Sequence, residues 1–415
     1  MRVAIVNSSH RLVAGIETYL NRVAPGLLEH GCELAFFAEA HGLGTRPEII
    51  AANDVPIWCI TELGANSAIA ALLKWRPDVI YVHGLHDIAV EAKLLTIAPA
   101  VFYAHAYTGT CISSRKSFRT PAVEPCDRRF GAACLAYYYV RRCGGLNPVT
   151  MWHDYHEQGA RLLNLRRYRA IVTSSEHLRR EYLRHGLAAD AVHLVRLPIS
   201  RHNALTPSSR RAMDRSRELR LLFAGRTVFE KGGDILIDAM PQVASMVGKP
   251  VQLDLAGDGQ ARSAWEKLAR KVMLHNSSVK IIFHPWLDSA DLAAAFESAD
   301  LLVVPSIWPE PFGLTGPEAG LHSLPAVAFS VGGIPEWLHE GVNGHLADAH
   351  PCTPDGLARA IAECFRDEAH YLDLRDGAYR VASQFELSDH VSQLVAILSS
   401  AVGDRAAIGS GMAAR

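Results

Sequence analysis

The chain has 415 residues, of which 49% are hydrophobic and 20% charged, and its formal net charge is -1. This length exceeds one ordinary hydrophobic core and predicts two domains. The near-zero net charge argues against a general attraction to nucleic acid, and no apolar run reaches the ~18–20 residues that a membrane-spanning helix needs.

The N-terminus, MRVAIVNSSH, holds one charge followed by a short apolar run. A secretory signal peptide needs a longer apolar stretch and a cleavage site of small residues. We therefore expect residues 2–7 to form a buried strand, and the protein to stay in the cytoplasm or at the inner face of its membrane. Eight cysteines in a chain of this length do not indicate a disulfide scaffold.

Short apolar runs alternate with helical patterns through the first half of the chain. Residues 17–30 have apolar side chains at helical spacing and are followed by Gly31, which predicts a helix. The predicted strands are 3–7, 33–38, 79–83, 100–105, 170–174 and 192–197. Continuous apolar strands separated by helices favour a parallel, doubly wound sheet that is covered on both faces.

Half of the cysteines gather in a segment near residues 106–150, which we interpret as an insert after the strand ending at His105. They are Cys111, Cys126, Cys134 and Cys143. Four thiols could hold a structural zinc, although the usual paired spacing of about two to four residues between ligands is missing. Ordinary buried cysteines are the alternative. Because the insert is also rich in arginine and aromatic residues, we expect it to shape an acceptor site.

A polar, arginine-rich stretch at 200–218 predicts a linker between an N-terminal domain, 1–199, and a C-terminal domain, 219–385. The later predicted strands are 219–225, 252–257, 279–284, 301–306 and 326–330. Residues 386–402 predict a helix that could return to the N-terminal domain, and 403–415 a loose tail. Two facing sheets of this kind direct their strand ends toward one crevice, where open α/β folds bind ligands.

The first candidate site follows the strand 219–225, in the sequence FAGRTVFEKGG. Arg226 offers a planar fork for phosphate oxygens, and Lys231 a compact charge. The helix predicted to begin near Gly233 adds free N–H groups, which favour an anion by about 0.3–1 kcal/mol. A diphosphate is the ligand that this pattern favours, and a solvated turn with two surface cations is the alternative.

The second candidate site is PSIWPEPFGLTGPEA, residues 305–319. Pro317 suits the first turn of a helix, where the carboxylate of Glu318 is favoured and can accept ribose hydroxyls. Glu310, on the preceding loop, can accept the hydroxyls of a sugar. Three backbone amides of the loop can face phosphate, those of Phe312, Gly313 and Leu314. The alternative is that Glu318 caps its helix and Glu310 is solvated.

Together these elements resemble glycosyltransferase family 4, a retaining family with two facing Rossmann-like domains, the GT-B architecture. The resemblance is carried by the AGR–KGG turn, AGDG at 256–259, the E-x7-E element EPFGLTGPEA, and GGIPE at 332–336 followed by Gly341 and Gly344. The N-terminal half matches more faintly, through AGIE at 14–17 and through His105. Ala14 and Ser323 depart from the family pattern, because each stands at a customary glycine.

The resemblance implies a role for each matching residue. Arg226 and Lys231 match the diphosphate-binding pair, and Glu318 matches the carboxylate on the donor ribose. Glu310 matches the carboxylate that holds the transferred sugar, and His105 a histidine beside the reacting carbon; these two are the expected catalytic residues. Gly15 matches the glycine of the first loop, where the backbone approaches the phosphate or acceptor.

The implied function is transfer of a sugar, with retention, from a nucleotide diphosphate sugar to a glycan, lipid-linked or natural-product acceptor, as in polysaccharide biosynthesis. No D-x-D motif occurs in the chain, and we expect no cofactor and no catalytic metal, because Arg226 and Lys231 can stabilise the leaving diphosphate. Alternatives are a nucleotide-sugar epimerase and a non-catalytic nucleotide-sugar-binding protein. The arginine-rich runs at 161–169 and 179–184 form either solvated helix faces or a peripheral membrane contact.

Overall fold

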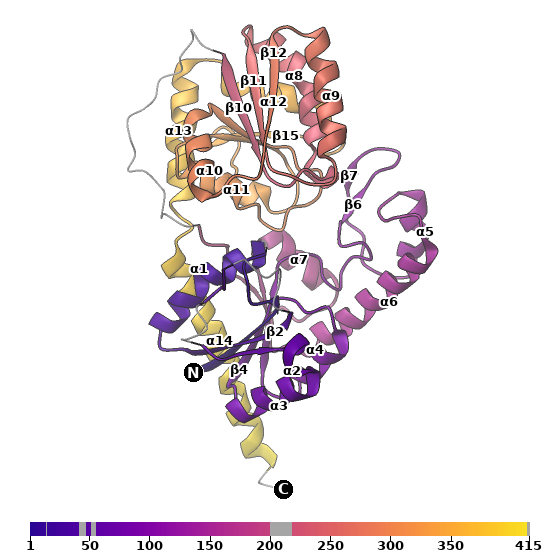
Figure 1. Cartoon of the computed structure of the whole chain (residues 1–415), viewed down its shortest axis with the longest axis vertical. Coiled ribbons are helices and arrows are strands. Elements are labelled where there is room, and N and C mark those ends of the chain that lie inside the picture. The colour runs from indigo at the N-terminus through magenta and orange to yellow at the C-terminus, as the bar shows by residue number, and fades with distance from the viewer. Residues whose placement is uncertain (14, 41–46, 51–54, 200–217, 413–415) are drawn as a thin grey trace.

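The chain folds into two α/β domains stacked along the long axis of the molecule (Figure 1). The computed structural model describes residues 1–13, 15–40, 47–50, 55–199 and 218–412, with the side chains described up to residue 403. Each domain has one parallel sheet, so the expected fold class, two Rossmann-like domains with mostly parallel sheets, is confirmed.

The N-terminal sheet has seven parallel strands in the order β3-β2-β1-β4-β5-β8-β9. Their bounds are β1 Arg2–Ser9, β2 Glu33–Ala40, β3 Ile57–Cys59, β4 Val79–Val82, β5 Ala100–Ala104, β8 Ala170–Thr173 and β9 Val192–Leu194. Alternate residues of β1 enter two separate apolar clusters, with Val3 and Ile5 on one face and Ala4 and Val6 on the other. Both faces are buried, which explains why the strand is apolar throughout.

Helices cover both faces of this sheet. They are α1 Gly15–Glu29, α2 Ile60–Leu63, α3 Ala65–Trp75, α4 Ile88–Leu94, α6 Pro148–Leu165 and α7 Glu176–Arg184. The segment between β5 and α6 holds only β6 Ser117–Phe118, β7 Glu124–Pro125 and α5 Ala133–Val140. The antiparallel pair β6–β7 stands apart from the main sheet and lies beside the C-terminal domain in Figure 1.

The C-terminal sheet has six parallel strands in the order β12-β11-β10-β13-β14-β15. They are β10 Leu219–Ala224, β11 Val251–Ala256, β12 Val279–His284, β13 Leu301–Val304, β14 Ala326–Phe329 and β15 Gly344–Ala347. The helices are η1 Phe229–Lys231, α8 Gly233–Val247, α9 Arg262–His275, α10 Ser289–Ser298, α11 Thr315–Gly320, η2 Ile334–Glu336, α12 Pro354–Cys364 and α13 Glu368–Ala382. Sequence reasoning missed the short edge strands β3 and β15.

The last helix, α14 Leu387–Met412, leaves the C-terminal domain and packs against α1, β4 and β5 of the N-terminal domain (Figure 1). Leu394 and Leu398 of this helix are fully buried in the N-terminal core. The backbone of α14 continues to Met412, through the first ten residues of the predicted tail, 403–415. Residues 413–415 and most of the predicted linker, 200–217, lie outside the described residues.

Within the described ranges, none of the helices combines the length and the apolar character needed to cross a membrane.

Candidate active site

The turn between β10 and α8 carries the two predicted phosphate-binding cations. Gly232 has a left-handed conformation (φ 65°), and a Cβ there would lie 2.0 Å from the carbonyl oxygen of Pro305. Only glycine therefore lets the turn lie this close to the loop after β13. Arg226 is exposed, and within the described part of the chain its guanidinium makes no hydrogen bond or ion pair.

Lys231 contacts the first of the two predicted carboxylates directly. Its Nζ lies 2.5 Å from Glu310 Oε1, which also accepts a hydrogen bond from Ser306 Oγ at 2.6 Å. Burial alone would raise the pKa of Glu310, but the charge and hydrogen bond of Lys231, together with Ser306 and Trp308, hold the pKa below its ordinary value. Glu310 is therefore a buried carboxylate, with the contacts from Lys231 and Ser306 on the same oxygen.

The loop that carries Glu310 is held by the GGIPE segment. Gly332 is left-handed (φ 60°), and a Cβ there would lie 2.3 Å from the Glu310 carbonyl oxygen; the Gly333 N–H donates to that oxygen at 2.7 Å. Trp337 Nε1 donates to the Phe312 carbonyl at 2.7 Å. Among the described residues, no acceptor is found for the N–H groups of Phe312, Gly313 or Leu314. These amides can face a ligand.

Glu318, the second predicted carboxylate, is paired with the opposite domain. Arg22 of α1 donates from Nη2 to Glu318 Oε1 at 2.9 Å, and both side chains are partly exposed. Sequence reasoning missed Arg22, because nothing in the sequence links two residues 296 positions apart. The ion pair links the middle of α1 to α11.

His105 lies just beyond the end of β5 in a group of rings. Its Nε2 is 2.8 Å from His83 Nδ1, and its ring contacts those of Tyr19 and Tyr103. Burial, with a smaller contribution from His390, lowers the pKa of His105 to about 3, so the imidazole is neutral near pH 7. His83 could not be recognised from the sequence, because it looks like the polar end of an ordinary strand.

The segment after His105 reaches the Glu310 loop. Tyr107 is fully buried, and its hydroxyl donates to the Pro309 carbonyl of the C-terminal domain at 2.6 Å. The structure thus places His105 two residues from a contact with the loop of Glu310, although no direct contact between the two is found in the described residues.

Gly15 is the first residue of α1 and is exposed. A Cβ built there meets nothing within 4 Å, so the fold itself does not require glycine at this position. Its neighbour Ala14 lies outside the described residues. Glu17, from the same AGIE motif, is buried and accepts a hydrogen bond from Asn7 Nδ2 at 2.8 Å, which anchors α1 to β1.

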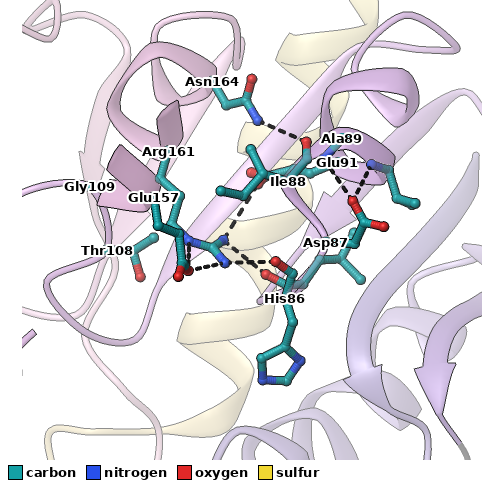
Figure 2. A network of polar contacts seen from close by, with 12 residues as sticks. His86, Asp87, Ile88, Ala89, Glu91, Thr108, Gly109, Glu157, Arg161 and Asn164 are labelled. Carbon is teal, nitrogen blue, oxygen red and sulfur yellow. Dashed lines mark hydrogen bonds and ion pairs between the residues drawn. The ribbon is translucent and has the colours of Figure 1, made fainter. Parts of the chain in front are cut away.

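The arginine-rich run at 161–169 is less solvated than its composition suggests. Arg161 is buried, pairs with Glu157 at 2.8 Å and donates to the backbone carbonyls of Leu85 and His86 at 2.9 and 3.1 Å (Figure 2). The side chain fastens α6 to the loop between β4 and α4. Arg161 therefore belongs neither to a solvated face nor to a membrane-binding face.

Two groups of three metal-ligand-type side chains lie close together in the described residues, within 4.8 Å of one another. They are His345, Glu363 and His370, and His153, Asp154 and Glu157. Neither group includes a predicted donor-site residue.

Two family models match successive parts of the chain. The model described as Glycosyltransferase Family 4 matches residues 13–201, and that of Glycosyl transferases group 1 matches residues 209–381. The boundary between them falls in the predicted linker.

Individual relatives match mainly in part. A D-inositol 3-phosphate glycosyltransferase of Streptomyces griseus is 33% identical over 207 residues, which are 48% of this chain and 39% of that protein. An uncharacterized glycosyltransferase of Methanocaldococcus jannaschii is 33% identical over 150 residues, 36% of each chain. The chain thus spans well under two thirds of the length of these curated relatives.

Solved structures match nearly the whole fold at low identity. HepE of Anabaena, solved in complex with UDP and glucose, is 18% identical with a TM-score of 0.66, over 96% of this chain and 100% of that one. Sucrose-phosphate synthase of Thermosynechococcus elongatus is 18% identical with a TM-score of 0.69, over 96% and 98%. These likenesses concern the fold.

Proposed function

The chain belongs to glycosyltransferase family 4 and has the GT-B fold, and from this premise we propose that it transfers a sugar from a nucleotide diphosphate donor. The acceptor class that we propose is a glycan, a lipid-linked sugar or a natural product, and the reaction retains the anomeric configuration without a metal or cofactor. We place the reaction in the cytoplasm, where eight free cysteines would stay reduced.

In this proposal the donor lies along the edge of the C-terminal sheet. Arg226 binds the diphosphate through its unpaired guanidinium, and Lys231, which has three N–H donors, gives one to Glu310 and keeps the others for phosphate. The free amides at 312–314 add neutral donors. Glu318 Oε1 is held by Arg22, which leaves Oε2 for a ribose hydroxyl.

Glu310 is proposed to hold the transferred sugar. Its hydrogen bonds from Lys231 and Ser306 both fall on Oε1, and the side chain of Trp308 also acts on the carboxylate and lowers its pKa. A carboxylate that is fixed in this way accepts a sugar hydroxyl without reorganisation, because its position is already set by Lys231 and Ser306.

The proposed step breaks the bond between the anomeric carbon and the diphosphate oxygen, and forms a bond from the same carbon to the acceptor oxygen on the same face. The acceptor's proton passes to the departing phosphate oxygen, so the products are a glycoside and a nucleoside diphosphate. Negative charge grows on the leaving oxygen, where Arg226 and Lys231 stabilise it. Neutral His105 positions the sugar from the N-terminal side.

One observation carries the proposal: Lys231 and Glu310 come from loops 79 residues apart and meet at 2.5 Å. A cation suited to phosphate and a carboxylate suited to sugar hydroxyls thereby lie side by side, as a sugar diphosphate requires.

The test is product analysis by mass spectrometry after incubation with a panel of nucleotide diphosphate sugars and acceptors. We expect a glycoside and a nucleoside diphosphate from the wild type, and losses of at least about 100-fold in Lys231→Met and Glu310→Gln, since removal of one stabilising donor costs about that much. Lys267→Met, an exposed lysine on α9, is the matched control and should retain full activity. An isomerised donor formed without acceptor would instead indicate an epimerase, and donor binding without any transfer would indicate a non-catalytic protein.

A further inference from the structure

The segment between β5 and α6, which we call the insert (residues 106–147), is poorly supplied with ordinary stabilising structure. Its regular elements are two strands of two residues each and α5. Tyr107 and Cys111 join a core cluster of the N-terminal domain, whereas the insert's other buried apolar side chains form a small separate cluster: Ile112, Phe118, Tyr138 and Cys143. An independent domain of this size usually needs a cross-link or a metal to hold one structure.

The four cysteines of the insert meet around a single cavity of about 20 Å³. Cys111 and Cys143 are buried, and Cys126 and Cys134 are partly buried. Residues spread over 33 positions of sequence have therefore been brought to one point.

The spacing of the sulfur atoms bears on what fills the cavity. Four sulfurs around one zinc at about 2.3 Å lie about 3.8 Å apart. In the described residues, no three of these sulfurs lie within 4.8 Å of one another. The cavity also exceeds the roughly 10–15 Å³ that one water-sized sphere needs. A cluster of several irons and sulfides holds its cysteine sulfurs further apart than a single ion does, because the inorganic core lies between them.

We propose that Cys111, Cys126, Cys134 and Cys143 bind an iron–sulfur cluster. Each cysteine releases its thiol proton to solvent and forms one sulfur–iron bond, and the oxidation state of the protein does not change. Four cysteine thiolates are the ordinary ligands of such clusters.

One backbone donor and one arginine of the cavity lining can act on a negatively charged centre. The Lys116 backbone N–H donates to Cys111 Sγ at 3.4 Å, and Arg128 lines the cavity, whereas the Lys116 ammonium is already paired with Glu181 at 2.5 Å. Hydrogen bonds to the sulfurs are among the contacts that tune such clusters.

The backbone beside the cysteines is strained in the manner of a ligand clamp. Ser114 and Lys116, close to Cys111, have φ of 55° and 47°, and Arg142, next to Cys143, has 53°. In the described chain only five residues other than glycine have positive φ, and three of them are these. Such conformations cost about 1–3 kcal/mol each and persist where surrounding structure enforces them.

The cluster would hold the insert against the turn between β10 and α8, which carries Arg226 and Lys231. Arg115 and Arg119 of the insert contact Glu230 at 3.1 and 3.0 Å, and Arg119 lies over the ring of Phe229. Glu230 immediately precedes Lys231. A centre that fixes the insert therefore fixes two arginines beside the proposed diphosphate site.

The test is the iron, sulfide and zinc content of the full chain, purified without oxygen and then reconstituted with ferric iron and sulfide in the presence of a thiol reductant. We expect between about two and four irons per chain, with matching sulfide, and visible absorption that bleaches on reduction. Cys111→Ser/Cys143→Ser should lose the iron, while Cys352→Ser, a buried cysteine of the C-terminal domain, should keep it.

Wild-type metal content decides the matter even where a variant fails to fold. One zinc per chain without iron would overturn the cluster, as would eight titratable thiols and no metal before and after reconstitution. The readout does not involve sugar transfer, so it stands or falls separately from the proposed activity.

Discussion

Replacing Lys231 by methionine measures how much the Lys231–Glu310 pair stabilises the folded protein. Glu310 is 6% exposed and Lys231 23%, so the variant leaves a nearly buried carboxylate with the side chains of Ser306 and Trp308 as its remaining partners. Breaking a fully buried pair costs ~3–5 kcal/mol, and a hydrogen bond to a charged group contributes ~1.5–3. Because Lys231 is partly exposed, we expect a loss of about 2 kcal/mol in the free energy of unfolding.

The second arm of this experiment is a double-mutant cycle measured by urea denaturation. Glu310→Gln removes the charge, so Lys231→Met/Glu310→Gln should recover at least about 1 kcal/mol relative to the sum of the single changes. Additive effects in the cycle would refute the account of the pair.

The pH dependence of the free energy of unfolding independently tests the direction of the Glu310 pKa shift. In the wild type the folded-state pKa of Glu310 is lowered, so its stabilisation is present above the unfolded pKa and is lost as pH falls through the folded one. Without Lys231, burial dominates and raises the pKa, so stability is instead lost as pH rises. The difference between wild type and Lys231→Met should therefore shrink from pH 7 to pH 4, and a constant difference would contradict the reasoning.

Three further predictions concern other parts of the site. Gly232→Ala should lower the free energy of unfolding by at least about 1–3 kcal/mol, because Gly232 has a left-handed φ and a Cβ there would meet Pro305. Gly15→Ala should leave stability unchanged and lower the transfer rate. Equal melting temperatures for the two variants would contradict this expectation. Glu318→Gln should weaken donor binding by about tenfold in calorimetry, or about 1.4 kcal/mol. The variant should change stability little, since the ion pair that it loses is partly exposed. Unchanged affinity would show that Glu318 does not bind the donor ribose. Burial lowers the pKa of His105 to about 3, so its stabilisation of the fold is present above its ordinary pKa and is lost as pH falls toward 3. His105→Gln should therefore weaken the acid-side dependence of the unfolding free energy on pH. An unchanged dependence would contradict the argument that His105 is buried in its neutral form.

The sheets were predictable because their strands are buried on both faces and therefore read as continuous apolar runs. β10, Leu219–Ala224, is an example, with a polar linker before it and a glycine turn after it. The strands β3 and β15 were missed because both are short edge strands, and β15 begins with Gly344 and contains His345. Short edge strands lack the apolar run that marks the others.

The site was predictable only where charged side chains follow directly after a predicted strand. Lys231 and Glu310 could be named from the spacing of motifs, but their contact depends on Gly232 and Gly332 holding two loops together. Contacts between domains left no trace in the sequence, as Arg22 with Glu318 shows. At Ser323 the structure explains a sequence pattern: its φ of 54° is a left-handed conformation that favours glycine, the customary residue at that position.

A crystal structure of the chain with a bound nucleotide diphosphate sugar tests the central claim most directly. We predict diphosphate oxygens within hydrogen-bond distance of Arg226 and Lys231, the ribose at Glu318 and the sugar at Glu310. A donor bound with its diphosphate away from Arg226 and Lys231, or with its sugar directed away from Glu310, would contradict the account.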